Sequence, residues 1–191
     1  MGASLAPTMR AFCALNLDVA STRRIEELAR SMRADPRTPK LRWVPPTRMH
    51  VTLKFLGEMD VGLAPALGDA LAPLAHADGV TRVGFRGVGG FPTDDRARVV
   101  VLLVDDASGE IARLARAVEE VAAGFGFERE SRAFTPHVTL ARAERPVDLR
   151  EGVGRTPIAL EPATLTELVL YRSDLRGPAS EYTALTRLPL R

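Results

Sequence analysis

The sequence contains one tetrapeptide twice: His-Val-Thr-Leu occupies residues 50–53 and again residues 137–140, 87 positions later. Two of the three histidines of the chain lie in these copies. Val, Thr and Leu favour β-strands, and alternate residues of a strand share a face. Each copy is therefore predicted to present an imidazole and a hydroxyl together and to turn its valine and leucine into a core. A plain strand explains the composition of each copy but not the duplication, so the repeat favours two related lobes.

The alternation of side-chain faces is predicted to continue along the strand beyond the first tetrapeptide. Thr52 and Lys54 are predicted to share a face with His50, because every second side chain of a strand points the same way. Phe55 is predicted to face the core. In the second copy an alanine takes the position of the lysine, and Arg142 follows it. The two lobes are therefore predicted to be related but not equivalent.

The rest of the chain mixes helix and strand patterns. Helical spacing of apolar residues predicts three helices: one with Ser21 as its N-cap, one that opens near Pro65, and one that Ser108 caps. Strands are predicted at residues 10–18, 49–56, 80–88, 98–104, 136–142, 165–172 and 182–188. The order is not a strict βαβ alternation, which favours an α+β fold with largely antiparallel sheets. The glycine-rich residues 84–90 lack the Gly-Lys-Ser/Thr ending of a phosphate loop and are predicted to form a turn.

Composition and charge exclude several classes of protein. The chain has 191 residues, enough for one domain with a core, and its longest strongly apolar run, residues 99–104, is too short to span a membrane. The start lacks the pattern of a secretory signal, which predicts a cytoplasmic protein. The single cysteine, Cys13, rules out an intrachain disulfide and is predicted to be buried and inert. Residues 1–50 carry nine basic and four acidic side chains. This basic patch, from Arg23 to Arg48, fits a phosphate-bearing partner as well as a solvated helix face.

Two facing His-x-Thr strands would supply the groups that displacement at phosphorus needs. Imidazoles with an ordinary pKa of about 6.5 can coexist as one protonated and one neutral ring at cellular pH. The reaction needs a base beside the entering oxygen, an acid beside the leaving oxygen and donors to the other phosphate oxygens. The candidate catalytic residues are therefore His50 and His137. The candidate substrate-binding residues are Thr52, Thr139, Lys54, Arg142 and Tyr171.

A metal site is the competing use of two histidines. Zinc sites take three or four ligands at short spacings such as His-x-x-x-His, and neither motif strand has a carboxylate on the histidine face. A Ser-His-Asp triad is also disfavoured, because the chain has no Gly-x-Ser-x-Gly turn. We therefore expect neither a metal nor another cofactor.

These residues resemble the 2H phosphoesterases, a superfamily named for two His-x-Thr motifs, and within it the RNA 2′,3′-cyclic phosphodiesterases, also called 2′-5′ RNA ligases. The segments that carry the resemblance are residues 10–15, 42–57 and 134–142, and residues 170–173 followed by Tyr182, which resemble the closing hairpin. The resemblance implies a bilobal, pseudo-twofold α+β fold in which two mainly antiparallel sheets form a central cleft and the helices pack outside. Residues 1–191 would then be one domain of two intertwined lobes, each contributing one His-x-Thr strand.

The resemblance also implies an activity: hydrolysis of a ribose 2′,3′-cyclic phosphate to a 2′-phosphate without a metal. By motif position His50 would donate a proton to the leaving 3′ oxygen and His137 would activate water, although identical motifs do not themselves separate these roles. Thr52 and Thr139 would hold phosphate oxygens. The implied partner is RNA or a nucleotide with a 2′,3′-cyclic phosphate end, and the chain is expected to be a monomer that does not bind membranes.

Some questions stay open at this point. The strand at residues 98–104 has no tryptophan where the family often places one, so Trp43, Phe91 and Tyr171 are the candidates for base stacking. The same site could instead carry out 2′-5′ ligation. A third possibility is a module that binds RNA ends without catalysis.

Overall fold

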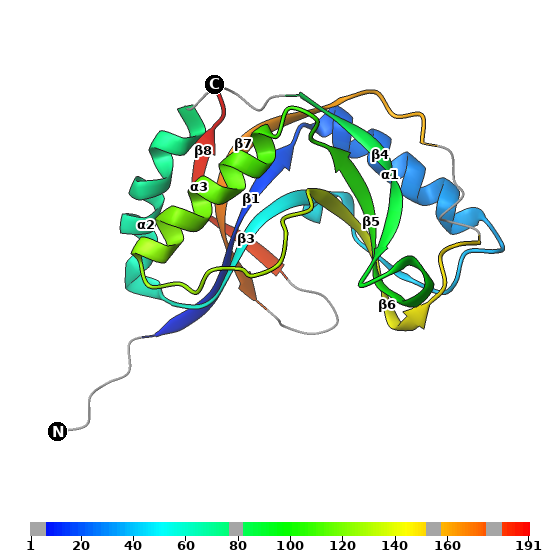
Figure 1. Ribbon diagram of the computed structural model, residues 1–191, viewed down its shortest axis with the longest axis horizontal. Coiled ribbons are helices and arrows are strands. Elements are labelled where there is room, and N and C mark those ends of the chain that lie inside the picture. Colours follow the sequence, from blue (N-terminus) through cyan, green and yellow to red (C-terminus); the bar gives the residue numbers. More distant parts are fainter. Residues whose placement is uncertain (1–6, 77–81, 152–157, 175–180) are drawn as a thin grey trace.

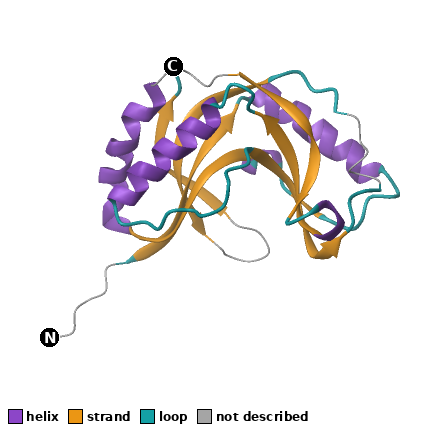
Figure 2. Ribbon diagram, in the orientation of Figure 1, coloured by secondary structure: helices purple, strands orange, loops and turns teal. Residues whose placement is uncertain are grey.

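The computed structural model describes residues 7–76, 82–151, 158–174 and 181–191 (Figure 1). The N-terminal residues 1–6, where the sequence predicted no leader, lie outside the described residues. Helices and strands are mixed along the rest of the chain (Figure 2). The helices are α1 (Val19–Ala34), α2 (Ala64–Leu71) and α3 (Glu110–Gly124). The strands are β1 (Thr8–Leu17), β2 (Arg42–Trp43), β3 (His50–Asp60), β4 (Arg82–Phe91), β5 (Ala97–Asp105), β6 (His137–Val147), β7 (Ala163–Asp174) and β8 (Glu181–Pro189).

The strands form two groups with antiparallel pairing throughout. In the first group β1 lies between β3 and β7, and β8 pairs with the other side of β7. In the second group β5 lies between β4 and β6, and the short β2 pairs with β6. Two narrow junctions, β3 with β6 and β4 with β7, join the groups into one eight-stranded sheet. The predicted α+β class is confirmed, and the two predicted sheets are continuous with each other.

The two groups repeat one order of elements. The first has the order β1, α1, β3, with the short β2 between α1 and β3 in the chain, and the second has the order β5, α3, β6. Val51 of β3 pairs with Val138 of β6, so equivalent residues of the two tetrapeptides meet at the junction. Figure 1 shows α2 and α3 on the side of β1 and β8, and α1 on the side of β4 and β5. α1, which follows β1 in the chain, therefore lies beside the second group of strands. α3, which follows β5, lies beside the first group.

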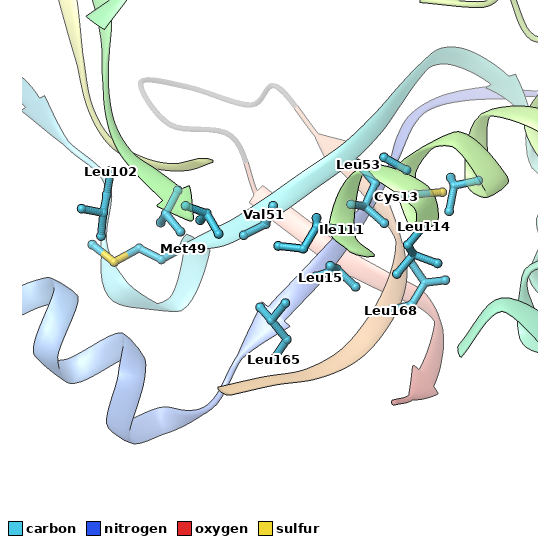
Figure 3. Packing of buried hydrophobic residues seen from close by; sticks show 14 of the residues in the cluster. Cys13, Leu15, Met49, Val51, Leu53, Leu102, Ile111, Leu114, Leu165 and Leu168 are labelled. Atoms are coloured by element: carbon cyan, nitrogen blue, oxygen red, sulfur yellow. The ribbon is translucent and has the colours of Figure 1, made fainter. Parts of the chain in front are cut away.

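One apolar cluster runs through both groups of strands. Figure 3 shows Cys13 and Leu53 beside Leu114 of α3, and Met49 beside Leu102 nearer to α1. Cys13 is fully buried, and burial raises the pKa of its thiol to about 12. The prediction that this cysteine is buried is confirmed, and a thiol with a raised pKa is a poor nucleophile. In the described part of the chain, no helix has the length and apolarity to cross a membrane.

Three local predictions are wrong. α1 begins before Ser21, because the carboxylate of Asp18 caps the helix and accepts a hydrogen bond from the Ser21 backbone amide at 2.6 Å. α3 begins after Ser108, and the carboxylate of Asp106 accepts hydrogen bonds from two amides of its first turn. In both cases a carboxylate displaces the serine because it is the stronger acceptor at a positive helix end. Residues 84–90 lie inside β4 and do not form a turn.

Candidate active site

Strands β3 and β6 set the two His-Val-Thr-Leu copies against each other. Val51 and Val138 pair at the junction and are both fully buried. The flanking histidine and threonine of each copy are partly exposed, on the opposite face. His50 and His137 are close enough for their charges to interact. The structure therefore brings the sequence-predicted histidines together on one face of the sheet.

Backbone carbonyls orient both imidazoles in the same way. Nδ1 of His137 donates a hydrogen bond to the carbonyl of Thr135 at 2.6 Å. The backbone of Arg48, again two residues before the ring, hydrogen-bonds to His50. Nε2 of His50 lies 3.1 Å from Oγ1 of Thr52, which leaves Nδ1 as the nitrogen that faces Arg48. A carbonyl at Nδ1 fixes the tautomer, so each ring presents Nε2 for proton transfer.

A β-bulge interrupts both motif strands at the same place. The pairing of β3 with β1 skips Leu53, and the pairing of β6 with β5 skips Leu140. An extra residue reverses the faces of the side chains that directly follow it. Accordingly, the first nine residues of the two strands have the same pattern of buried and exposed side chains. The bulge therefore occurs at the equivalent position of both motif strands.

The bulge turns Lys54 away from the histidines, so the prediction that it shares their face and binds phosphate is wrong. The Lys54 side chain is 3% exposed. Its Nζ donates hydrogen bonds to Oε1 of Glu119 on α3 and to the carbonyl of Glu128, each at 2.7 Å. Phe55, predicted to face the core, is 68% exposed instead. Lys54 thus connects β3 to α3 and to the segment that follows it.

The same bulge puts Arg142 on the histidine face, because its strand position is equivalent to that of Phe55. Burial lowers the pKa of His50 to about 4, with smaller contributions from the charges of His137 and Arg142. Burial also lowers the pKa of His137, and Arg142 adds to this effect. Both imidazoles are therefore neutral in the free protein at neutral pH. A bound anion would favour protonation of one of them, because an opposite charge raises the pKa of a base.

Aromatic rings surround His50. The ring of Phe12 stacks on the imidazole at a centroid distance of 5.1 Å and on Tyr171 at 5.2 Å. Tyr182 meets the imidazole edge-on at 5.6 Å. The Tyr171 hydroxyl is 2.8 Å from the side-chain nitrogen of Asn16, which donates a hydrogen bond to it. The predicted residue Tyr171 is thus fixed within this aromatic cluster.

Sequence reasoning missed three residues of this cluster, namely Phe12, Asn16 and Tyr182. Asn16 is brought opposite His50 by the pairing of β1 with β3, and Tyr182 arrives through β8. No local pattern signals such long-range pairings. His137 has a different neighbour, the ring of Phe91, which meets it edge-on at 4.9 Å.

A groove of about 1030 Å³ opens at His50. Its walls come from the end of β1, the start of α1, the residues just before β3, and β7 and β8. Tyr171 and Tyr182 line it together with His50. The charged side chains of its lining are Arg23, Glu26, Arg48, Glu181 and Arg187. The groove therefore gathers part of the basic patch from the first quarter of the sequence.

No metal site accompanies the histidines among residues 7–76, 82–151, 158–174 and 181–191. In those ranges no group of three or more His, Cys, Asp or Glu side chains is arranged to hold an ion. The third histidine, His76, is exposed just after α2, as predicted. The donor set around His50 and His137 consists of aromatic rings, threonine hydroxyls and an arginine, which does not suit a divalent cation.

Residues 18–177 match the family model of the 2′-5′ RNA ligase superfamily. The chain belongs to this superfamily. A member from Thermus thermophilus, an RNA 2′,3′-cyclic phosphodiesterase, is 33% identical over 162 residues, which are 78% of this chain and 75% of that protein. A member with the same name from Methanothermobacter thermautotrophicus is 28% identical over 182 residues, 92% of this chain and 95% of that protein.

Other relatives match over a shorter part. The RNA 2′,3′-cyclic phosphodiesterase of Aeropyrum pernix is 41% identical over 93 residues, 49% of this chain. The chain spans about half the length of that superfamily member and of the one from Geobacillus stearothermophilus, at 52% and 47% respectively.

Two solved structures have a similar fold over nearly all of the chain. The protein TT0787 of Thermus thermophilus superposes with a TM-score of 0.74 at 25% identity, covering 96% of this chain and 98% of that one. Escherichia coli LigT complexed with 3′-AMP superposes with a TM-score of 0.72, also at 25% identity, covering 96% and 99%. The family resemblance of the two motif blocks is thereby confirmed, together with the α+β architecture.

Proposed function

We propose that this superfamily member hydrolyses a ribose 2′,3′-cyclic phosphate to a 2′-phosphomonoester, with His50 and His137 as the acid and base and without a metal. The observation that carries the proposal is the pairing of Val51 with Val138, which sets two identically oriented imidazoles on one face of the sheet. The names of the relatives, RNA 2′,3′-cyclic phosphodiesterase, support the substrate class. Residues 1–191 act as one domain in this proposal, because the site takes one strand from each lobe.

His137 takes the role of base and His50 that of acid. Both oxygens of the cyclic phosphate belong to the terminal ribose, so the leaving 3′ oxygen lies on the ribose side of phosphorus and the attacking water on the opposite side. The groove that can accept the ribose opens at His50. The water oxygen bonds to phosphorus as its proton passes to Nε2 of His137. The bond to the 3′ oxygen breaks as that oxygen takes a proton from Nε2 of His50, and one water is consumed.

The negative charge of the bound phosphate allows His50 to take up from the solvent the proton that it lacks in the free protein. In the free protein His50 is neutral at pH 7, because its pKa is about 4. An anionic phosphate between the rings raises that pKa and makes the imidazolium available as an acid. Thr52, Thr139 and Arg142 lie on the same face and act as donors to the phosphate oxygens, where transition-state charge accumulates.

The test is turnover of 2′,3′-cyclic AMP in the presence of EDTA. We expect activity in EDTA, and a loss of about 10²- to 10⁴-fold in kcat for His50→Ala and for His137→Ala. Thr52→Ala and Thr139→Ala should be milder, and His76→Ala, an exposed histidine outside the site, serves as the matched control. If His50→Ala or His137→Ala kept the wild-type rate, that histidine would not have the role assigned to it. Activity lost in EDTA and restored by added metal would sink the acid–base mechanism.

A second candidate activity is 2′-5′ ligation, which the name of the superfamily favours. A 5′ hydroxyl of a second RNA would replace water as the nucleophile, with the same acid and base. Incubation of an RNA with a cyclic phosphate end, with and without a 5′-hydroxyl acceptor strand, distinguishes a 2′-phosphate product from a joined strand. A module that binds RNA ends without catalysis would give neither product. The monomeric state and the cytoplasmic location remain predictions from the sequence.

A further inference from the structure

Asn16 lies in the middle of a row of three polar side chains that crosses the sheet. It pairs with His50 of β3 on one side and with Glu167 of β7 on the other. Residues that pair directly in antiparallel strands share a face, so all three lie on the histidine face. A neutral amide therefore separates the carboxylate of Glu167 from the imidazole of His50.

Hydrogen bonds fix the Asn16 side chain on this face. Its Nδ2 lies 2.8 Å from the hydroxyl oxygen of Tyr171 and 3.4 Å from Oε1 of Glu167. The Tyr171 hydroxyl donates to Oδ1 of Asn16 at 3.0 Å. Oε1 of Glu167 also accepts a hydrogen bond from Nη1 of Arg187 on β8 at 2.7 Å. A phenol hydroxyl has one proton to donate, so in this arrangement the proton of Tyr171 goes to Asn16 and not to a phosphate oxygen.

The ring of Tyr171 is the outer layer of a stack that ends on His50. It packs on Phe12, and Phe12 packs on the imidazole. Tyr171 also lines the groove that opens at His50, so its ring lies between the groove and Phe12 and limits the access of water to the stack. Charges attract more strongly where less water screens them. A dry imidazole therefore gains more from a bound phosphate than a hydrated one.

We propose that Asn16 is a positioning residue for His50: it keeps the ring of Tyr171 against Phe12, and Glu167 with Arg187 keeps Asn16 in place. This inference rests on the proposed hydrolysis, in which His50 is the acid. Asn16 acts through Tyr171 and contacts neither the phosphate nor the leaving oxygen. Arg187 serves the site through its ion pair with Glu167 and not as a free cation.

A double-mutant cycle on kcat/KM for 2′,3′-cyclic AMP tests whether Asn16 acts through the Tyr171 hydroxyl. We expect Asn16→Ala and Tyr171→Phe each to reduce kcat/KM about 10- to 100-fold, as small displacements of catalytic groups do. The variant with both changes should lie within about twofold of the weaker single variant, because the two changes remove one and the same contact. A loss from Asn16→Ala that is as large in Tyr171→Phe as in the wild type would overturn the inference.

Tyr182→Phe is the matched control for the cycle. It removes a hydroxyl from the same aromatic cluster, but that hydroxyl is not bonded to Asn16. Asn16→Ala should therefore have its full effect in the Tyr182→Phe background. If Tyr182→Phe reduced the effect of Asn16→Ala as much as Tyr171→Phe does, Asn16 would act on the cluster as a whole and the specific contact would be refuted.

An NMR titration of histidine-labelled protein provides a readout that a merely structural role would not move. The His50 signal is assigned from its absence in His50→Gln. The pKa of His50, about 4 in the wild type because of burial, should rise by about one unit in Asn16→Ala and in Tyr171→Phe as water reaches the ring. Tyr171→Phe keeps the aromatic ring, so it tests the contact also if Asn16→Ala is too unstable to measure. An unmoved pKa of His50 in Tyr171→Phe would overturn the inference.

Neither substitution changes a charge, so a shift of the His50 pKa reports burial. The charged or titratable groups that face His50 are His137 and Arg142 on β6, Arg48 before β3, Glu167 on β7, and the charged groove residues of α1 and β8. All of them are retained in both variants.

The two measurements separate this inference from the proposed function. The titration needs no turnover. A shifted pKa of His50 with no hydrolysis by any of the proteins, the wild type included, would refute the hydrolase and leave the effect of Asn16 on His50. Hydrolysis that is lost in His50→Ala but unchanged in Asn16→Ala and Tyr171→Phe would refute the positioning role and leave the hydrolase.

Discussion

Nζ of Lys54 lies 2.7 Å from Oε1 of Glu119, and this ion pair joins the strand that begins at His50 to helix α3. The same carboxylate oxygen also accepts a hydrogen bond from the backbone amide of Glu130 at 3.1 Å. Lys54 is nearly inaccessible to water, so removing one partner leaves a charge in a poorly hydrated place. Loss of either member alone is therefore expected to destabilise the fold around the site.

We expect Lys54→Met to lower the free energy of unfolding by about 3 kcal/mol, because Glu119 loses its counter-ion while the volume of the side chain is kept. Urea unfolding measures the change. The double variant Lys54→Met/Glu119→Leu should recover much of the loss, since it removes both charges. A Lys54→Met variant as stable as the wild type would show that the ion pair contributes little.

Phe55 and Leu53 test the bulge directly. Leu53 is 6% exposed and Phe55 is 68% exposed, although ordinary alternation would put both in the core. Leu53→Ala should cost about 2–5 kcal/mol of unfolding free energy, as for other buried leucines. Phe55→Ala should cost less than about 1 kcal/mol. If the two costs were similar, the strand would have no bulge at this position.

Arg142 is expected to act on both the rate and its pH dependence. Arg142→Gln should reduce kcat/KM about 10²-fold, as the loss of one positioned donor does in other enzymes. Its charge also lowers the pKa values of His50 and His137, so the bell-shaped profile of kcat/KM should move to higher pH in the variant. Arg145→Gln, an exposed change further along β6, is the control. A lower rate with an unmoved pH profile would mean that Arg142 does not act on the imidazoles.

The stability of the protein should depend on pH through His50. Its pKa is about 4 in the folded chain and about 6.5 in the unfolded one. Between these values the unfolded chain binds a proton that the folded chain does not, so stability falls as the pH drops from about 6.5 to about 4. The full effect is on the order of 3 kcal/mol. Asp35 and Asp148, with pKa values of about 2, lose their contributions only at lower pH.

Urea unfolding of the wild type and His50→Gln at pH 7, 6 and 5 checks this expectation. The variant should have a shallower slope, and the residual slope should reflect His137, whose pKa is lowered in the same direction. Identical slopes in the two proteins would mean that burial does not hold His50 in its neutral form.

The sequence was sufficient for features that depend on local pattern. Alternation and duplication predicted the strands of His50 and His137, their buried valines and the α+β class, because side-chain period and apolar spacing are local properties. The bulge was not predictable, because it depends on which residues of β1 and β5 pair with the motif strands. Lys54 and Phe55 were therefore assigned to the wrong faces. Tyr182 was missed for the same reason, since it reaches His50 only through pairings across the sheet.

Helices α1 and α3 lie beside each other's strands, and this exchange bears on the ancestry of the chain. A half-length chain with a single His-Val-Thr-Leu copy would leave its sheet uncovered as a monomer. Two such chains could cover each other by swapping helices, as domain-swapped homodimers do. Duplication of the gene and fusion of the two copies would preserve that arrangement. The two halves could then acquire different residues at equivalent positions. The lysine at position 54 and the alanine at position 141 are a difference that the two halves of one chain can acquire, whereas two copies of a single gene product cannot.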